Sequence, residues 1–123
     1  MTVNEAVARA ARAVGESISR EELCEWLAEI ENTVILEICA LHDGDYRREL
    51  MTGDDDGDRL LNAPEPYSRI YLNYLIMKSD LTLRDIPQYI NSASVFAESF
   101  RDFADWYNRT YMPLSVAEIL IGG

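Results

Sequence analysis

The stretch from Ile86 to Tyr111 has the longest uninterrupted helical periodicity in the chain, and it restricts the fold more than any other segment. Apolar side chains recur there at steps of three and four, which places them on one side of an α-helix. They are Tyr89, Ala93, Phe96, Phe100, Phe103 and Tyr107, and they include every phenylalanine of the protein. A wide apolar stripe has to be covered by other elements. We therefore predict a core helix packed against further helices, and not a ligand-binding box.

Two segments nearer the N-terminus also have helix signals, over residues 2–14 and 19–41. Each begins with a Thr or Ser that is followed three residues later by Glu, the pattern of a capping box. The second segment carries a long apolar stripe at helical spacing. Its members are Leu23, Trp26, Leu27, Ile30, Val34, Ile38 and Leu41.

Residues 42–65 interrupt this pattern with glycine, proline and aspartate, which favour turns. We predict a long acidic loop whose least ordered part is the GDDDGD run at 53–58, and a loop of this length is usually functional or mobile. We expect the Leu50-Met51 and Leu60-Leu61 pairs to attach it to the helices.

A third helix is predicted to start at Pro66, because proline fits the first turn of a helix. Its predicted apolar stripe is Ile70, Tyr74, Met77 and Leu81, flanked by Tyr71, Leu75 and Lys78. Met112-Pro113 ends the fourth helix, since the residue before a proline disfavours helical geometry. The predicted fold is all-α, a bundle of four main helices in one domain over 1–123, with a 114–123 tail that forms a helical turn or an extended arm.

Length and composition agree with a single globular domain, because the chain has 123 residues, of which 48% are hydrophobic. We find no apolar run of the roughly 18 residues that span a bilayer, and no secretory signal. Cys24 and Cys39 both fall on the predicted second helix, about 22 Å apart along its axis. That separation is too large for a disulfide, so we expect free thiols in a reducing compartment.

The charge balance is the unusual feature of the composition. The chain has 11 Lys and Arg against 22 Asp and Glu, for a net charge of −11. Such a surface repels phosphates, so sequence-specific nucleic-acid binding is not expected. An acidic solvated surface, a DNA mimic, and a wall past which DNA slides all remain compatible with this charge.

The acidic run at 53–58 does not satisfy the rules for an EF-hand calcium loop. With Gly57 at loop position 6, Asp54 and Asp56 occupy positions 3 and 5. Positions 1 and 12 are then Thr52 and Ala63, so two principal ligands are missing. We interpret the run as a solvated acidic turn.

No catalytic arrangement stands out. His42 is the only histidine, so any Ser–His or Cys–His pair would have to use it, and a zinc site would need three or four protein ligands. We expect His42 to interact with a helix C-terminus instead. Two acidic pairs share helix faces at a spacing of three, Glu22 with Glu25 and Asp102 with Asp105. All-α nucleotide pyrophosphatases hold Mg²⁺ with such pairs, but no basic motif for the phosphates accompanies them here. We predict no catalytic residue, no cofactor and no metal, and a protein that is not an enzyme.

Three stretches together resemble a family of small proteins of tailed phages and prophages that are encoded among head and tail morphogenesis genes. They are CEWLAEIENTVILEI at 24–38, LLNAPEPYSRIYLNYLIMKSD at 60–80, and YINSASVFAESFRDFADWYNRTYMP at 89–113. The "P-x-PY…IY…YL" and "F…A…YNRT…MP" segments carry the likeness. The resemblance implies a head–tail connector (adaptor) subunit, a helical module that assembles as a ring under the portal.

That role implies partners among other phage structural proteins, portal or tail components, and a second copy of the chain in a ring. It implies a location in the bacterial cytoplasm during assembly and then in the virion. The candidate partner interface is the C-terminal arm, with the 42–59 loop as a second surface facing a partner or the channel. The interface residues on the C-terminal arm are Tyr111, Met112, Pro113, Leu114, Ile119 and Ile121. For Tyr111 and Met112, simple packing at a helix end is an equal alternative.

Two further classes stay open at this stage. One is an acidic DNA mimic that occupies a host nuclease or regulator, which carboxylates spaced like phosphates would support. The other is a Mg²⁺-dependent all-α nucleotide pyrophosphatase, which turnover of nucleoside triphosphates would support.

Overall fold

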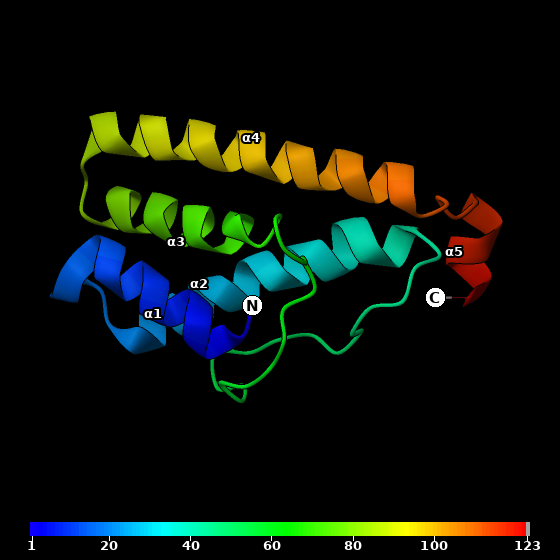
Figure 1. The fold of residues 1–123 in the computed structure, drawn as a ribbon, viewed down its shortest axis with the longest axis horizontal. Helices are drawn as coiled ribbons and strands as arrows, with labels where there is room; N and C mark the ends of the chain where they lie inside the picture. The colour runs from blue at the N-terminus through cyan, green and yellow to red at the C-terminus, as the bar shows by residue number, and fades with distance from the viewer. Residues whose placement is uncertain (123) are drawn as a thin grey trace.

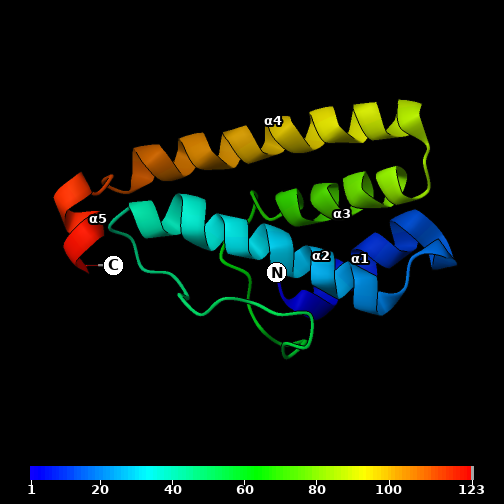
Figure 2. The same ribbon diagram turned by 180° about the vertical axis from the view of Figure 1, so that it is seen from behind.

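The computed structural model describes residues 1–122 and is all-α, as predicted, with five α-helices and no strand in that range. The long helix α4 (Ile86–Thr110) lies along one side of the molecule (Figure 1). Beneath it lie α3 (Arg69–Thr82) and the C-terminal part of the helix that begins as α2 (Arg20–Thr33), while α1 (Val3–Val14) lies on the far side of α3. The short α5 (Val116–Gly122) and the α3–α4 turn occupy opposite ends, as both ribbon views show (Figures 1 and 2).

The first helix begins as the sequence predicts. Thr2 and Glu5 form a reciprocal capping box, in which the Glu5 amide donates to Thr2 Oγ1 at 3.2 Å and the Thr2 amide donates to Glu5 Oε1 at 3.2 Å. Ala6 and Ala10 are completely buried. These small side chains let α1 pack closely against α2 and α3.

The second helix reaches Leu41, as predicted, but it is not regular throughout. After Thr33 the chain forms a π-helical turn at Val34–Ile38 and then a 3₁₀ turn at Cys39–Leu41. A π turn adds a residue and rotates the following side chains around the helix axis. Cys39 is therefore buried while Leu41 is exposed, so the predicted stripe is wrong in its last turn.

The third helix differs from the prediction in both start and face. Residues 65–68 form a turn with a cis Glu65–Pro66 bond, and α3 begins only at Arg69. Its buried residues are Ile70, Tyr71, Leu75 and Ser79, whereas Tyr74 and Met77 are half-buried and Leu81 is exposed. The predicted stripe is wrong except at Ile70, because α3 lies between α1, α2 and α4 and its most buried side faces all three.

The fourth helix matches its predicted bounds, with Asp85 as its cap. Phe103 and Tyr107 are buried, but Phe96, Phe100, Tyr89 and Ala93 are only half-buried. The side of α4 pressed against α3 instead includes Ser92 and Ser99, and Asn73 Nδ2 donates to Ser99 Oγ at 3.0 Å. The predicted stripe is thus sealed in its C-terminal half and partly open in its N-terminal half.

The 42–68 segment is held to the helices by a buried carboxylate that the sequence did not single out. Glu31 of α2 is fully buried and accepts hydrogen bonds from the Tyr71 hydroxyl (2.7 Å), the Asn62 amide (2.9 Å) and Asn62 Nδ2 (3.0 Å). Tyr71 in turn accepts from the Ala63 amide at 2.8 Å. Burial raises the pKa of Glu31, although these hydrogen bonds and the charge of Arg59 oppose the shift.

The acidic part of the segment folds around a buried cation. Arg59 donates to Asp55 Oδ2 at 2.6 Å and also to the backbone carbonyls of Leu50 and Glu49. The Arg59 carbonyl accepts from the Val3 amide at 3.0 Å, which connects this turn to the start of α1. Met51 and Leu61 are buried, as expected, while Leu50 and Leu60 are exposed.

Candidate partner interface

The C-terminal arm, residues 111–122, is attached to the body at its root. The Asp43 amide donates to the Met112 carbonyl at 3.0 Å, and the Met112 amide donates back to Asp43 Oδ1 at 2.9 Å. The Leu114 amide donates to the Leu41 carbonyl at 2.9 Å. The root therefore pairs with the chain that leaves the end of the second helix.

Tyr111 fastens this root through its ring. The ring lies 4.5 Å from that of Tyr107 and 6.2 Å from that of Trp106, measured between centroids. It also lies directly over Gly44, where an added Cβ would come within 2.5 Å of the ring. Gly44 is thus required for the close approach, and Tyr111 is part of the packing that holds the arm.

His42 lies at the same junction and does what a histidine at a helix C-terminus is expected to do. Its Nδ1 donates to the Ile38 carbonyl at 2.7 Å, because a carbonyl can only accept. Its Nε2 lies 3.2 Å from Asn108 Oδ1, and its ring meets Tyr107 edge-on at 5.0 Å. The histidine thus connects the C-terminal end of the second helix to that of α4, which stabilises the part of the body to which the arm is attached.

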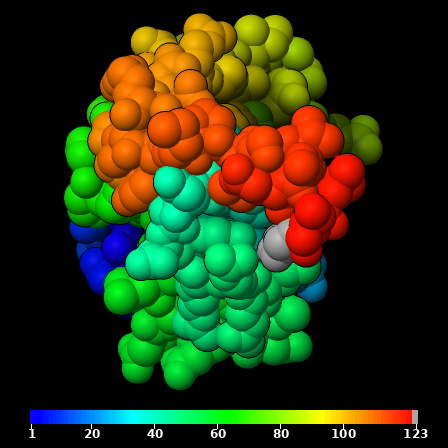
Figure 3. Space-filling view, turned by 90° about the vertical axis from the view of Figure 1, so that its right-hand side faces the viewer, coloured from blue at the N-terminus to red at the C-terminus, as the bar shows by residue number. Residues whose placement is uncertain are grey.

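Beyond this root, α5 presents apolar side chains to solvent. Ser115 Oγ accepts from the Glu118 amide at 3.1 Å and starts the helix. Val116, Leu120 and Ile121 are 73%, 80% and 87% exposed. Figure 3 shows α5 standing on the surface at this end of the molecule, beside the C-terminal end of α4. Apolar side chains gathered on an exposed segment are typical of an interaction surface.

The structure separates the six residues of the predicted interface into two groups. Tyr111 and Leu114 are half-buried and hold the arm to the body. Met112, Pro113, Ile119 and Ile121 are exposed. Val116 and Leu120 lie within the predicted 114–121 arm but were not singled out, although their spacing of four marks one side of a helix.

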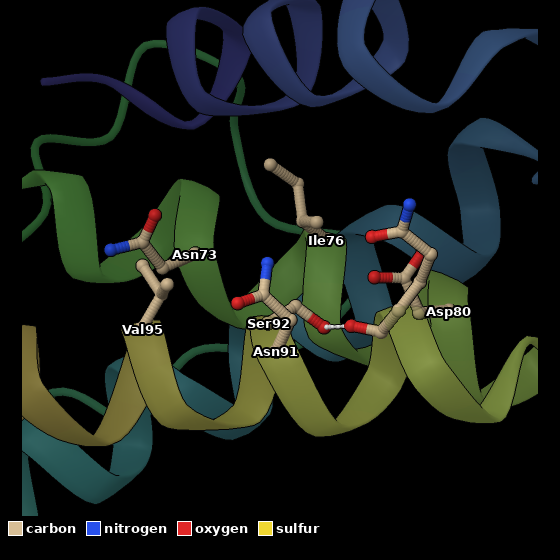
Figure 4. A pocket seen from close by; sticks show the side chains of 7 residues that line it. Asn73, Ile76, Asp80, Asn91, Ser92 and Val95 are labelled. Carbon is tan, nitrogen blue, oxygen red and sulfur yellow. Dashed lines mark hydrogen bonds between the residues drawn. The ribbon is translucent and has the colours of Figure 1, made fainter.

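A second feature is a hollow between α3 and α4 of about 160 Å³ (Figure 4). Its lining is mainly amide and small side chains: Asn73, Ile76, Asp80, Gln88, Asn91, Ser92 and Val95. Ser92 Oγ is occupied in a hydrogen bond to the Gln88 carbonyl at 3.0 Å. The side chains include a single carboxylate and neither a histidine nor a cysteine.

The acidic pairs of the pyrophosphatase hypothesis do not converge. Asp102 lines a hollow of about 330 Å³ with Arg69 and Glu98, whereas Glu25 lines another with Glu21 and Asp54. Over residues 1–122, no group of three or more His, Cys, Asp or Glu side chains is arranged to hold a metal ion.

The two cysteines are free and buried, as predicted. Burial raises the pKa of Cys39 to about 11 and also raises that of Cys24. A thiol with a raised pKa is rarely ionised at neutral pH, so neither is poised as a nucleophile.

No family model, curated protein or solved structure matches this chain. In the part of the chain that the structure describes, no helix is long and apolar enough to cross a membrane.

Proposed function

We propose that this protein is a phage or prophage virion assembly protein, a head–tail connector (adaptor) subunit that binds other proteins and transforms no substrate. The scaffold proposed for this role is a bundle of four main helices with the acidic 42–65 segment on one side. Its partners are portal or tail components and further copies of itself. Its location is the bacterial cytoplasm during assembly and then the virion.

The observation that carries the proposal is the C-terminal arm. Its root is held by three hydrogen bonds and the Tyr111 ring, while Val116, Leu120 and Ile121 remain exposed. A rigid root with an uncovered apolar end is a suitable way to present a binding segment, because little ordering entropy is lost when the partner arrives. The resemblance of residues 24–38, 60–80 and 89–113 to phage connectors supplies the class of partner.

The acidic surface supports the same proposal. DNA that passes a ring of such subunits meets like charge and is not retained, since the net charge is −11 per chain. Sequence-specific nucleic-acid binding and membrane binding have no part in the proposal.

The test compares particles made with wild-type protein, without the protein, and with the double variant Leu120→Ser/Ile121→Ser. We expect to find the wild-type protein in purified virions. We expect the absence of the protein and the double variant each to produce filled heads without tails. The matched control is Leu60→Ser, because Leu60 is also exposed but lies in the 42–68 segment, beside the start of α1. Full, tailed, infectious particles that lack the protein would overturn the proposal.

A further inference from the structure

We infer that α5 of one copy packs on a second copy of the chain, against the exposed apolar side of the N-terminal half of α4 and the α3–α4 turn. This inference rests on the proposed function, because it names the surface that receives the same arm. It is carried by an apolar surface at the opposite end of the molecule from α5.

That surface, called the α4 patch below, combines a second apolar side of the N-terminal half of α4, which shares only Ala93 with the predicted stripe, and the turn before it. Ile86 and Ile90 are 53% and 64% exposed, and they share a side of α4 with half-buried Ala93 and exposed Ala97 at steps of four and three. Leu81 and Leu83 extend the apolar surface into the turn, and both are exposed. Two alanines between larger side chains leave room for another helix to approach closely.

The arm of a given chain does not reach its own α4 patch. Twenty residues of α4 separate Ile90 from Thr110, which is about 30 Å along a helix. The seven residues of α5 extend only about 10 Å. Figures 1 and 2 place α5 and the α3–α4 turn at opposite ends. The α4 patch therefore receives an arm only from another molecule.

The two surfaces also carry one pair of opposite charges. Glu118 is the only charged residue of α5. Arg84 lies in the α3–α4 turn, where its positive φ of 58° helps the chain reverse direction. Within residues 1–122, neither belongs to an ion pair. Asp80 and Asp85 lie within four residues of Arg84, and Asp85 already caps the Gln88 amide at 3.3 Å. In a chain of net charge −11, a basic residue beside an apolar surface is where an acidic neighbour is least repelled.

The geometry of α5 supplies the reason for docking. An isolated helix shorter than about 12 residues is only marginally stable in water, and most helix stability comes from packing of an apolar face. The α5 helix has seven residues, and all four of its large apolar side chains are exposed. Packing on the α4 patch buries both sets of side chains at once.

Because the arm and the α4 patch are different surfaces, the contact is head-to-tail. Such heterologous contacts close into a ring or continue as a filament, whereas an arm–arm contact would close a twofold dimer. A contact made by seven residues also lies at the small end of stable interfaces, so each contact alone is weak. The experiment therefore has to trap the contact and not rely on a stable dimer.

The test uses two purified full-length variants, Leu120→Cys and Ile90→Cys, mixed at equal concentration under mild oxidation. We expect the disulfide between Leu120→Cys and Ile90→Cys to form in about tenfold higher yield than the disulfide between Leu120→Cys and the control Leu60→Cys. A tenfold ratio corresponds to about 1.4 kcal/mol of preference. Leu60 is a matched control because it is 64% exposed, like Ile90, and lies on the loop beside α1. Cys24 and Cys39 do not interfere, since both are buried.

Charge exchange in the same assay separates docking from random collision. Glu118→Arg on the arm partner, or Arg84→Glu on the receiving partner, should each reduce the mixed disulfide about two- to fivefold. The two changes together should restore it. Equal yields with Ile90→Cys and Leu60→Cys, or a predominance of the Leu120→Cys homodimer, would overturn the inference. If either result is found but virion assembly still requires the arm, the inference fails and the proposed function stands. If the mixed disulfide forms but the protein is absent from virions, the proposed function fails and the inference stands.

Discussion

The acidic segment 42–68 and the C-terminal arm 111–122 both run outside the four longer helices, yet the structure treats them in opposite ways. The acidic segment is rich in charge but is held by a buried carboxylate and a buried guanidinium, those of Glu31 and Arg59. The arm is rich in apolar residues, but most of its large side chains are exposed. Composition therefore does not decide which segment is held to the body.

The difference comes from where backbone groups find partners. The acidic segment donates or accepts along its length, with bonds from Val3 to Arg59, from Asn4 to Gly57 and from Leu61 to Met1. The arm pairs with the body only over residues 111–114, and among the described residues the hydrogen bonds of α5 outside its own helix go only to Ser115, just before it. A segment with satisfied polar groups belongs to the fold, whereas an apolar segment beyond its last anchor is available to a partner.

The largest effect should follow from removal of the buried acceptor. Glu31→Ala leaves the Tyr71 hydroxyl and both Asn62 donors without their partner, so we expect a loss of about 3 kcal/mol in the free energy of unfolding. Urea denaturation measures it. Glu25→Ala is the matched control, because Glu25 is exposed on the same helix and should change stability by less than about 0.5 kcal/mol. Equal losses in the two variants would mean that Glu31 does not hold the segment.

The next effect tests the root of the arm. Gly44→Ala places a Cβ against the Tyr111 ring at 2.5 Å, so the ring must move off the surface formed by Tyr107 and Trp106. We expect a loss of about 2 kcal/mol, typical of overpacking, together with a changed environment for Trp106 in fluorescence.

Gly53→Ala provides the comparison for that variant. A Cβ there comes within 3.1 Å of Glu25 Cγ, which can shift slightly, and makes only ordinary 3.7 Å contacts with the Glu25 backbone, so the change should cost under about 0.5 kcal/mol. Unchanged stability and fluorescence in Gly44→Ala would show that Tyr111 does not depend on this contact.

A smaller effect concerns pH. Burial raises the pKa of Glu31 above 4.5, so the folded state binds the proton more tightly than the unfolded state. The stability that this provides is complete below the unfolded pKa and is lost as pH rises through the folded pKa. The difference in unfolding free energy between wild type and Glu31→Gln should therefore fall from pH 4.5 upward and then level off. A difference that is constant with pH would mean that Glu31 has its ordinary pKa.

Much of the fold is predictable from local signals. Capping boxes and apolar periodicity gave α1, the start of α2 and the bounds of α4 nearly to the residue, because those signals act within one turn. The face of α3 was wrong because three helices surround it, and the π turn at Val34–Ile38 leaves no mark in the apolar spacing. Glu31 was missed because its partner Tyr71 lies 40 positions along the chain, and a burial set by distant residues has no local signature.

The candidate interface was predictable in part for the same reason. The exposed end of the arm follows from a proline stop and a short apolar tail. The α4 patch did not follow, because Ile86, Ile90 and Ala97 lie beside the predicted stripe and only Ala93 belongs to it. Figure 1 shows the last turns of the second helix, Val34–Leu41, beneath the C-terminal half of α4, and α3 beneath the N-terminal half, where Ile86 and Ile90 remain exposed.

The smallest effect on stability should come from the arm, and it distinguishes the two segments most directly. Leu120→Ser/Ile121→Ser removes two large apolar side chains, yet both are already exposed in the single chain, so we expect the unfolding free energy to change by less than about 0.5 kcal/mol. Urea denaturation at low protein concentration measures this. The same double change at the buried residues Leu75 and Phe103 should cost several kcal/mol, about 3 or more for each site. If the serine variant lost comparable stability, the arm would belong to the core of its own chain, and its apolar side chains would not be available to a partner.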